Sequence, residues 1–340
     1  MSAPILITGA TGFVGGELAR ILVGRGLPVH AFARAQPTSG SLTGLPITWH
    51  LGELEDARSV DAAVASAGAG ARVIHSGALI SYASRDTQRA HAINVEGTRH
   101  VLAACKRHRS ARLCFVSSVV AVGPSPDGSV LDESSPFHGA HLGVDYMSTK
   151  RAAEELVLAS ARELDVVVAN PGAVIGPAER KSNTVEFLRQ LAAGKRPIAA
   201  PPGSIAVVGI RDTAEGILLV LERGRRGERY LLFERCVRTR ELFTQMGAAL
   251  GQPGLKRTLP RALWPLVVGA ARLVDRIHPL ELTPPQALVM LGQELQFSNR
   301  KAREELGWKP MPLEEVLAHT VAVLRERGVL PAPLGVRSAE

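Results

Sequence analysis

A tyrosine and a lysine stand four positions apart in the segment Tyr146-Met147-Ser148-Thr149-Lys150. In a helix this spacing puts both side chains on one face, one turn apart. A phenol, with an ordinary pKa of about 10, is a poor acid or base at neutral pH, and a nearby ammonium favours its phenolate form. The chain has only three tyrosines, so a chance pairing is rare. We predict that Tyr146 transfers a proton and that Lys150 lowers its pKa.

Three glycines follow the first apolar run of the chain at GxxGxxG spacing. Glycines permit a tight turn and the close approach of a pyrophosphate, while a following helix supplies N–H donors and the positive end of its dipole. The spacing is weak evidence alone, but a place directly after a strand and before a helix is typical of a dinucleotide-binding loop. The residues expected to bind the cofactor here are Gly9, Thr11, Gly12, Phe13, Val14 and Gly15.

The end of the second predicted strand, Phe32-Ala33-Arg34, indicates which dinucleotide is bound. An acid at this place would bind the ribose 2′-OH of NAD, whereas a base would accept a 2′-phosphate. No acid occurs between Gly26 and Gly52, and the permanently charged, planar guanidinium of Arg34 suits a phosphate. We predict that NADP(H) is preferred, with NAD(H) as the alternative.

The composition excludes several other classes of protein. The 340 residues are 46% hydrophobic and 21% charged, which are ordinary globular values and exclude wholesale disorder, and the formal net charge is +8. Aromatic residues make up 4%, too few to interleave with the arginines of 223–240 as a nucleic-acid-binding platform would require, so we expect no nucleic-acid partner. No transmembrane or secretory segment is expected, and three scattered cysteines favour a reducing cytoplasm. The histidines do not have metal-ligand spacing, so no metal is predicted.

Short apolar runs alternate with amphipathic stretches in the first half of the chain. Strands are expected at Ile5–Thr8, Val29–Ala33, Thr48–Leu51, Val73–His75, Leu113–Ser117 and Val166–Ala169. Helices are expected between them, at Phe13–Gly24, Ala57–Ala67, Asn94–His108 and Ser148–Glu163. This alternation predicts an α/β fold with a Rossmann-type, doubly wound parallel sheet.

The second half is expected to be different. We predict a dinucleotide-binding domain over residues 1–175 and a smaller, mostly helical substrate lobe over 176–340, with 205–233 returning to the main sheet. Asp212 and Glu215 have the spacing of a capping box, which predicts that Asp212 caps a helix.

Several motifs together carry a resemblance to a known family: TGATGFVG at 8–15, Asn94-Val95-Glu96-Gly97-Thr98-Arg99, FVSS at 115–118, YMSTK at 146–150, Asn170-Pro171-Gly172 and Gly209-Ile210-Arg211-Asp212. They resemble the extended short-chain dehydrogenases/reductases, also called the NAD-dependent epimerase/dehydratase family. The resemblance covers nearly the whole chain. The strand end Ala33-Arg34 and the run Leu219–Leu232 are most similar to the branch of dihydroflavonol reductases, cinnamoyl-CoA reductases and 3β-hydroxysteroid dehydrogenases.

The resemblance implies roles for individual residues. Tyr146 would be the proton donor or acceptor, and Lys150 would also hydrogen-bond the nicotinamide ribose. Ser118, rather than Ser117, aligns with the family serine that orients the substrate oxygen.

On the cofactor side, Glu53 and Leu54 stand where the family usually has Asp-Leu against the adenine, and Pro171 would flank the nicotinamide. Asn94 would brace the cofactor side, with a helix cap as the alternative.

The candidate substrate residues are largely apolar, and each has core packing as its alternative: Leu79, Tyr82, Phe137, Leu142, Val144, Val174, Trp264 and Leu266. We therefore predict an NADPH-dependent reductase of a ketone or aldehyde on a steroid-, flavonoid-, aryl- or acyl-like body, or the reverse reaction. The alternatives are an NAD-dependent nucleotide-sugar epimerase/dehydratase and a non-enzymatic NADP-sensing protein. The stretch Pro260–Ile277 is expected to be pocket wall, interface or membrane-surface contact, and the protein a monomer or homodimer.

Overall fold

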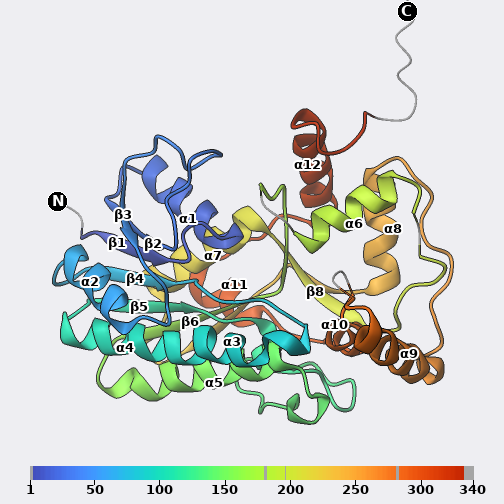
Figure 1. The fold of residues 1–340 in the computed structure, drawn as a ribbon, viewed down its shortest axis with the longest axis horizontal. Helices are drawn as coiled ribbons and strands as arrows, with labels where there is room; N and C mark the ends of the chain where they lie inside the picture. The colour runs from blue at the N-terminus through green and yellow to red at the C-terminus, as the bar shows by residue number, and fades with distance from the viewer. Residues whose placement is uncertain (1–2, 180–181, 196, 281–282, 333–340) are drawn as a thin grey trace, which may run out of the picture.

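A computed structural model describes residues 3–179, 182–195, 197–280 and 283–332 (Figure 1). Its main sheet has seven parallel strands in the order β3-β2-β1-β4-β5-β6-β9. The strands are β1 (Ile5–Thr8), β2 (Val29–Ala33), β3 (Ile47–Leu51), β4 (Arg72–His75), β5 (Arg112–Val116), β6 (Val166–Pro171) and β9 (Arg229–Leu232). Parallel strands are covered on both faces, which explains their nearly continuous apolar runs.

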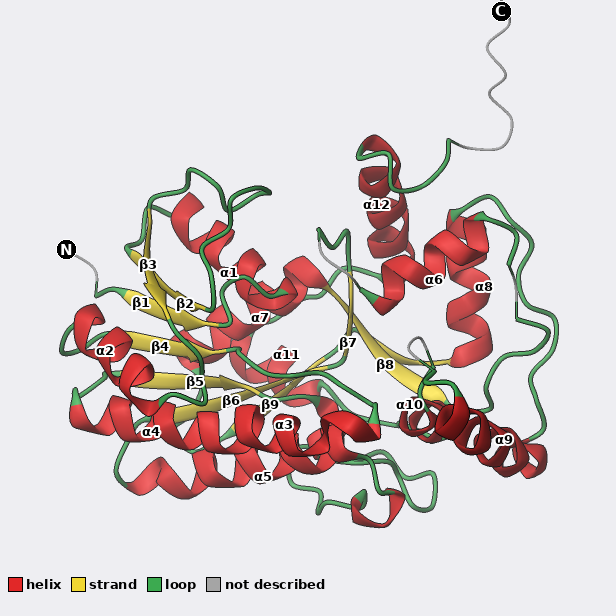
Figure 2. Cartoon of the chain, in the orientation of Figure 1, coloured by secondary structure: helices red, strands yellow, loops and turns green. Residues whose placement is uncertain are grey.

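Helices cover both faces of this sheet (Figure 2). Against one face pack α1 (Phe13–Gly24), α7 (Ile210–Arg223) and α11 (Arg300–Leu306). Against the other pack α2 (Ala57–Ala67), α4 (Gly97–Arg107) and α5 (Asp145–Ala159). The predicted Rossmann-type, doubly wound α/β fold is confirmed.

A second, smaller sheet and further helices complete the molecule (Figure 2). This sheet consists of β7 (Ala173–Ile175), β8 (Ser204–Gly209) and β10 (Arg235–Arg238), and it shares a core with α6 (Asn183–Ala192), α8 (Thr239–Ala249) and α12 (Leu313–Glu326). The helices α9 (Trp264–Ile277) and α10 (Pro285–Leu291) lie at the outer end (Figure 1). The domain boundaries at 175 and 176 stay a prediction. Within the described ranges, no helix is both long enough and apolar enough to cross a membrane.

The capping-box prediction for α7 is wrong. The N-cap is Gly209, and Asp212 lies inside the first helical turn. Here β8 runs directly into the helix, and the hydroxyl of Thr213 donates to the Gly209 carbonyl. The Asp212 carbonyl instead accepts a 3.0 Å hydrogen bond from Nε1 of Trp308, which ties the helix to the chain beyond α11.

Candidate active site

The glycine loop joins β1 to α1 at the carboxyl edge of the sheet. Gly9 has a φ of +69°, a left-handed conformation that strains any side chain. A Cβ on Gly9 would lie 2.5 Å from Cα of Gly77, and a Cβ on Gly15 would lie 2.3 Å from the Gly9 carbonyl oxygen. Gly12 is exposed and is the N-cap of α1, without a side-chain hydrogen bond from the described residues. The first-turn N–H groups of α1 are therefore available to an anion, as pyrophosphate binding requires.

The residues predicted to bind the adenosine half lie after β2 and β3. Arg34 is exposed directly beyond β2, and no ion pair holds its guanidinium within the described part of the chain. Leu54 is buried against Gly77, since a Cβ added to Gly77 would lie 2.8 Å from Cδ1 of Leu54. Glu53 is exposed beside it. The fold thus gathers these residues on the same edge as the glycine loop, because the carboxyl ends of parallel strands meet there.

Ser118 and Tyr146 meet beyond the end of β5. Tyr146 lies on α5 and is 8% exposed, and the Ser118 hydroxyl is near enough to its phenol to lower the pKa of Tyr146. Ser118 N-caps the short turn that follows β5, and its Oγ lies 3.5 Å from the carbonyl oxygen of Pro171. Ser117 Oγ, by contrast, is buried without a hydrogen-bond partner among the described residues. Ser118 and Tyr146 therefore lie near each other, and the role of Ser118 stays a prediction.

Burial controls the protonation of Tyr146 and Lys150. Burial raises the pKa of Tyr146 to about 12, although the nearby Ser118 hydroxyl opposes the shift. Burial likewise lowers the pKa of Lys150 to about 7, against the attraction of the Glu154 carboxylate. Burial is thus the main influence on the phenol in the cofactor-free chain, and the lowering of its pKa by Lys150 stays a prediction. At neutral pH the phenol keeps its proton, which suits a proton donor.

The Lys150 ammonium points toward the end of β5. Its Nζ donates a 2.7 Å hydrogen bond to the Val116 carbonyl and lies 4.4 Å from the centre of the Phe115 ring. Lys150 is 2% exposed. These contacts fix the side chain beneath Tyr146, one helical turn along α5.

Lys150→Met is expected to change the pH dependence of stability in the cofactor-free protein. The unfolded chain binds the Lys150 proton up to an ordinary pKa near 10.4, whereas the folded chain releases it near 7. The cost of burying the ammonium is therefore complete below pH 7 and fades as the pH rises toward 10. From pH 6 to 10, wild type should gain about 4 kcal/mol relative to the variant.

The measurement is urea unfolding of both proteins across this pH range, with the difference in unfolding free energy plotted against pH. A difference that stays constant with pH would contradict the lowered pKa of Lys150.

Asn94 connects the loop after β4 to α5. It lies in a π-helical turn (Ala92–Glu96), a feature frequent at functional sites. Its Oδ1 accepts from the Leu79 N–H at 2.7 Å, and its Nδ2 donates to the Leu79 carbonyl at 3.0 Å and to Thr149 Oγ1 at 3.1 Å. The helix-cap alternative for Asn94 is wrong. The residue instead fastens the helix turn that carries Tyr146 and Lys150.

A second polar link, which the sequence did not reveal, runs through His75 at the end of β4. His75 is fully buried, with Nδ1 2.6 Å from Thr8 Oγ1 and Nε2 3.0 Å from Thr98 Oγ1. Thr98 donates its own proton to the Asn94 carbonyl, so Nε2 of His75 must be the donor toward Thr98. Burial, aided by the charge of Lys150, lowers the pKa of His75 to about 3, and the ring is neutral. The Nε2-protonated tautomer of His75 on β4 thus contacts Thr8 on β1 and, through Thr98, the π-helical turn.

A buried ion pair lies beneath the same helix. Glu154 Oε1 is 2.9 Å from Nη1 of Arg229, and the two side chains are 0% and 9% exposed. Asn170 Nδ2 donates to Glu154 Oε2 at 2.6 Å and to the Ser118 carbonyl at 3.0 Å. The network therefore joins α5 to β6 and β9 and reaches the backbone of Ser118. The spacing of four residues from Lys150 places Glu154 on the inner face of α5, but no sequence signal identifies a partner 75 residues away.

An apolar cluster surrounds the Tyr146 phenol. It consists of Val120, Val144, Met147 and Met290, with partly buried Tyr82, Phe137, Leu142 and Val289 packed against it. The Tyr82 ring meets the Tyr146 ring edge-on, with centroids 5.6 Å apart. Of the predicted substrate residues, the structure thus brings Tyr82, Phe137, Leu142 and Val144 to the phenol.

The other predicted substrate residues lie elsewhere. Leu79 is half-buried and holds Asn94, and Val174 packs against the core formed by α1 and α7. Trp264 donates from Nε1 to the Leu288 carbonyl at 3.0 Å, whereas Leu266 is 70% exposed on α9.

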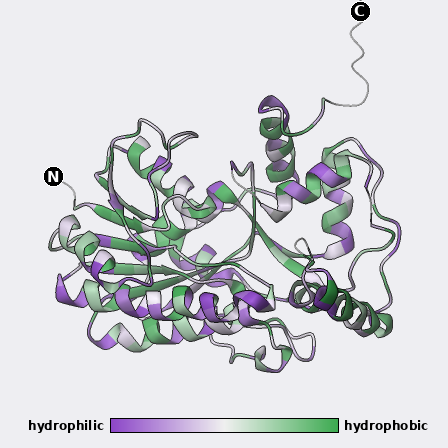
Figure 3. Cartoon of the chain, in the orientation of Figure 1, coloured by the Kyte–Doolittle hydropathy of each residue, from purple (hydrophilic) through white to green (hydrophobic). Residues whose placement is uncertain are grey.

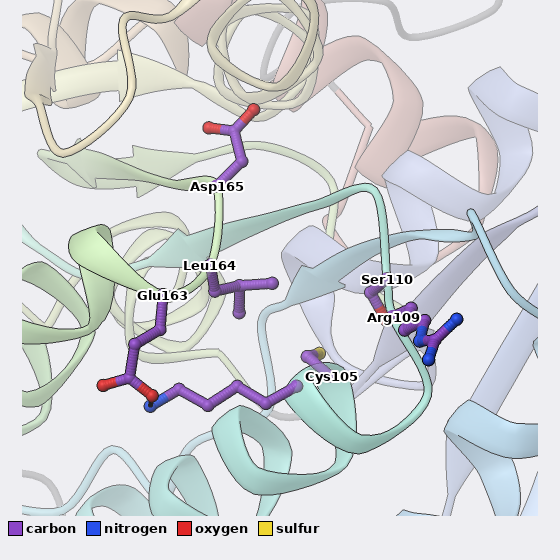
Figure 4. Close-up of a pocket in the computed structure, with 7 residues that line it drawn as sticks. Cys105, Arg109, Ser110, Glu163, Leu164 and Asp165 are labelled. Atoms are coloured by element: carbon purple, nitrogen blue, oxygen red, sulfur yellow. Dashed lines mark ion pairs between the residues drawn. The ribbon is translucent and has the colours of Figure 1, made fainter.

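A hollow of about 360 Å³ lies at the opposite, amino-terminal edge of the sheet, where α4 ends and β6 begins (Figure 4). Lys106 pairs with Glu163 at 3.0 Å across it. Burial raises the pKa of the Cys105 thiol there to about 12, which makes it unreactive. No residue of the Tyr146 cluster lines this hollow. Within the described ranges, no group of three or more histidines, cysteines and acids could hold a metal.

The glycine loop lies at the switch point between β1 and β4, where sheets of this kind bind dinucleotides, and a protonated phenol lies beyond the end of neighbouring β5. The class that this arrangement defines is the NAD(P)-dependent oxidoreductases.

Comparison with known proteins gives the family. A model described as the NAD dependent epimerase/dehydratase family matches residues 5–232. The chain belongs to this family, the extended short-chain dehydrogenases/reductases, as the resemblance predicted.

Three comparisons extend over nearly the full length. The chain is 32% identical to "Sterol demethylase protein B" of Methylococcus capsulatus over 335 residues, which cover 96% of this chain and 99% of that protein. It is 30% identical to "Putative dihydroflavonol 4-reductase" of Synechocystis over 338 residues, covering 96% of both. The crystal structure of gox2253 superimposes with a TM-score of 0.82 at 29% identity, covering 97% of this chain and 100% of that chain.

Proposed function

We propose that this chain is an NADPH-dependent carbonyl reductase that converts a ketone or aldehyde on a hydrophobic substrate to an alcohol, or performs the reverse reaction. The observation that carries the proposal is a protonated phenol, Tyr146, set among the apolar side chains of Tyr82, Phe137 and Leu142. A sugar diphosphate would need polar and charged partners in that place. Two relatives are named for a sterol and a dihydroflavonol, which supports a hydrophobic substrate.

Bound NADPH would supply the hydride to the carbonyl carbon. The phenol of Tyr146 donates its proton to the carbonyl oxygen, and the Ser118 hydroxyl orients that oxygen by a hydrogen bond. Lys150, held by the Val116 carbonyl, stabilises the phenolate that forms, and it would also hydrogen-bond the nicotinamide ribose. The surrounding apolar side chains exclude water, which strengthens each of these interactions.

We assign the cofactor contacts by position around the loop and strand ends. The loop and first turn of α1 would hold the pyrophosphate, at Gly9, Thr11, Gly12, Phe13, Val14 and Gly15. Arg34 would bind the 2′-phosphate, Glu53 and Leu54 would contact the adenine, and Asn94 and Pro171 would lie on the nicotinamide side. All three cysteines are free, which fits a reducing cytoplasm as the place of action.

The first test is to denature purified protein, identify any released dinucleotide, and titrate the protein with NADPH and NADH. A protein that carries little dinucleotide and prefers NADPH supports a reductase that exchanges its cofactor in every turnover. Release of near-stoichiometric NAD would instead favour the epimerase/dehydratase alternative, because an enzyme that regenerates its cofactor need not release it.

Arg34→Ala is expected to weaken NADPH binding by roughly 10- to 100-fold, because a charge-assisted contact to the 2′-phosphate is lost. NADH lacks this phosphate, so its affinity should change by no more than about twofold. Fluorescence titration of both cofactors measures the effect, and Arg300→Ala, another exposed arginine, is the control. Equal losses for NADPH and NADH would exclude a phosphate contact.

A further inference from the structure

Helix α9 presents an apolar stripe to the surface. The stripe consists of residues spaced three and four apart, as on one face of a helix: Leu263, Leu266, Val267, Ala270, Leu273, Val274 and Ile277. Leu266 is 70% exposed, Leu273 61% and Ile277 83%. The opposite face of the helix docks on the protein through buried Val268 and Ala271. Figure 3 shows α9 as a largely hydrophobic helix at the edge of the molecule.

Positive charge flanks this stripe on one side. Arg272 and Arg276 are exposed, lie four residues apart, and make no ion pair with any residue that the structure describes. The acid of this helix, Asp275, is turned toward the docked side, where its Oδ1 accepts a 2.8 Å hydrogen bond from the Leu280 N–H. The exposed surface of α9 is therefore apolar and cationic.

The stripe covers the outer side of the helices that enclose the Tyr146 cluster. Trp264 of α9 donates to the Leu288 carbonyl of α10. Met290 of α10 packs in the cluster around Tyr146. A surface bound to the stripe would thus be separated from Tyr146 by α9 and α10.

We propose that the α9 stripe docks on an anionic lipid bilayer, with the helix axis in the plane of the interface. An apolar face bordered by arginines is the composition that binds this interface, since the apolar side chains enter the acyl boundary and the guanidiniums meet lipid phosphates. The chain's net charge of +8 adds attraction. A second copy fits less well: two stripes packed together would bring the arginine flanks to their interface, whereas the acid of this helix, Asp275, is turned to the docked side.

This inference goes beyond the proposed function and can be tested without turnover. Full-length protein is sedimented with vesicles of phosphatidylcholine alone and of phosphatidylcholine mixed with phosphatidylglycerol. Wild type is expected to sediment with the mixed vesicles, less so at high salt. Leu266→Glu/Leu273→Glu should abolish binding, and Arg272→Ser/Arg276→Ser should weaken it roughly tenfold or more. Leu51→Glu is the matched control, because Leu51 is also 61% exposed but lies on β3.

Two results would overturn the proposal. One is wild type that stays in the supernatant with both vesicle types. The other is a wild type that is a dimer in light scattering and does not bind vesicles, together with a Leu266→Glu/Leu273→Glu variant that is a monomer. That result would assign the stripe to a second copy of the chain. Reduction of a water-soluble aldehyde by both stripe variants should equal that of wild type. This readout separates failure of lipid docking from failure of the proposed chemistry.

Discussion

Tyr146→Phe is expected to lower kcat by about 10²- to 10⁴-fold, the usual contribution of a positioned acid or base. The variant keeps the ring that packs among Val144, Met147 and Met290 but has no proton to donate. Because the affinity for NADPH does not depend on this proton, it should stay within about twofold of wild type. Consumption of NADPH with a hydrophobic carbonyl substrate measures the rate, and fluorescence titration measures the binding.

Tyr82→Phe is the matched control for this experiment. Its ring lies edge-on to Tyr146 in the same cluster, and burial together with the neighbouring phenol raises the pKa of Tyr82. If Tyr82 only shapes the pocket, its variant should retain kcat within about fivefold of wild type. If Tyr82→Phe lost its activity and Tyr146→Phe kept it, the proton donor would be Tyr82 and not Tyr146.

Glu154→Ala is expected to destabilise the protein by about 3–5 kcal/mol, because it leaves the buried guanidinium of Arg229 without its carboxylate. It also removes one acceptor from the Asn170 amide, whose other bond holds the Ser118 carbonyl. We therefore expect a lower rate as well as a lower midpoint of urea unfolding.

The neighbouring residue supplies the control. Glu155 is exposed and pairs with Arg151 at 2.7 Å, so Glu155→Ala should cost no more than about 0.5 kcal/mol. In the double variant Glu154→Leu/Arg229→Met both charges are gone, and the stability should recover most of the loss. A Glu154→Ala variant as stable as wild type would contradict the stabilising role of the buried ion pair.

Most of the main sheet could be predicted because its inner strands are buried on both faces and appear as apolar runs, whereas the edge strand β3 is only partly buried. The glycine loop and the Tyr146–Lys150 spacing could be predicted because local geometry fixes both. The short strand β7 (Ala173–Ile175) was missed, since three residues show no period.

The polar links beneath the site could not be predicted for a different reason. His75 meets Thr8 and Thr98 only once β1 and β4 pair in the sheet. Glu154 finds Arg229 only when α5 packs over β9. The raised pKa of Tyr146 likewise arises from burial by segments distant in sequence, which spacing along one helix does not report.

The first turn of α5 is connected directly to α10. The Asp145 N–H donates to Gln286 Oε1 at 2.9 Å, and Gln286 Nε2 donates back to Asp145 Oδ2 at 2.7 Å. Asp145 precedes Tyr146, so these two hydrogen bonds connect the position of α10 to the backbone that carries the phenol. If the substrate of the proposed reaction packs against α10, its shape would also affect the alignment of the phenol. A poorly fitting molecule would then react slowly even after it has bound.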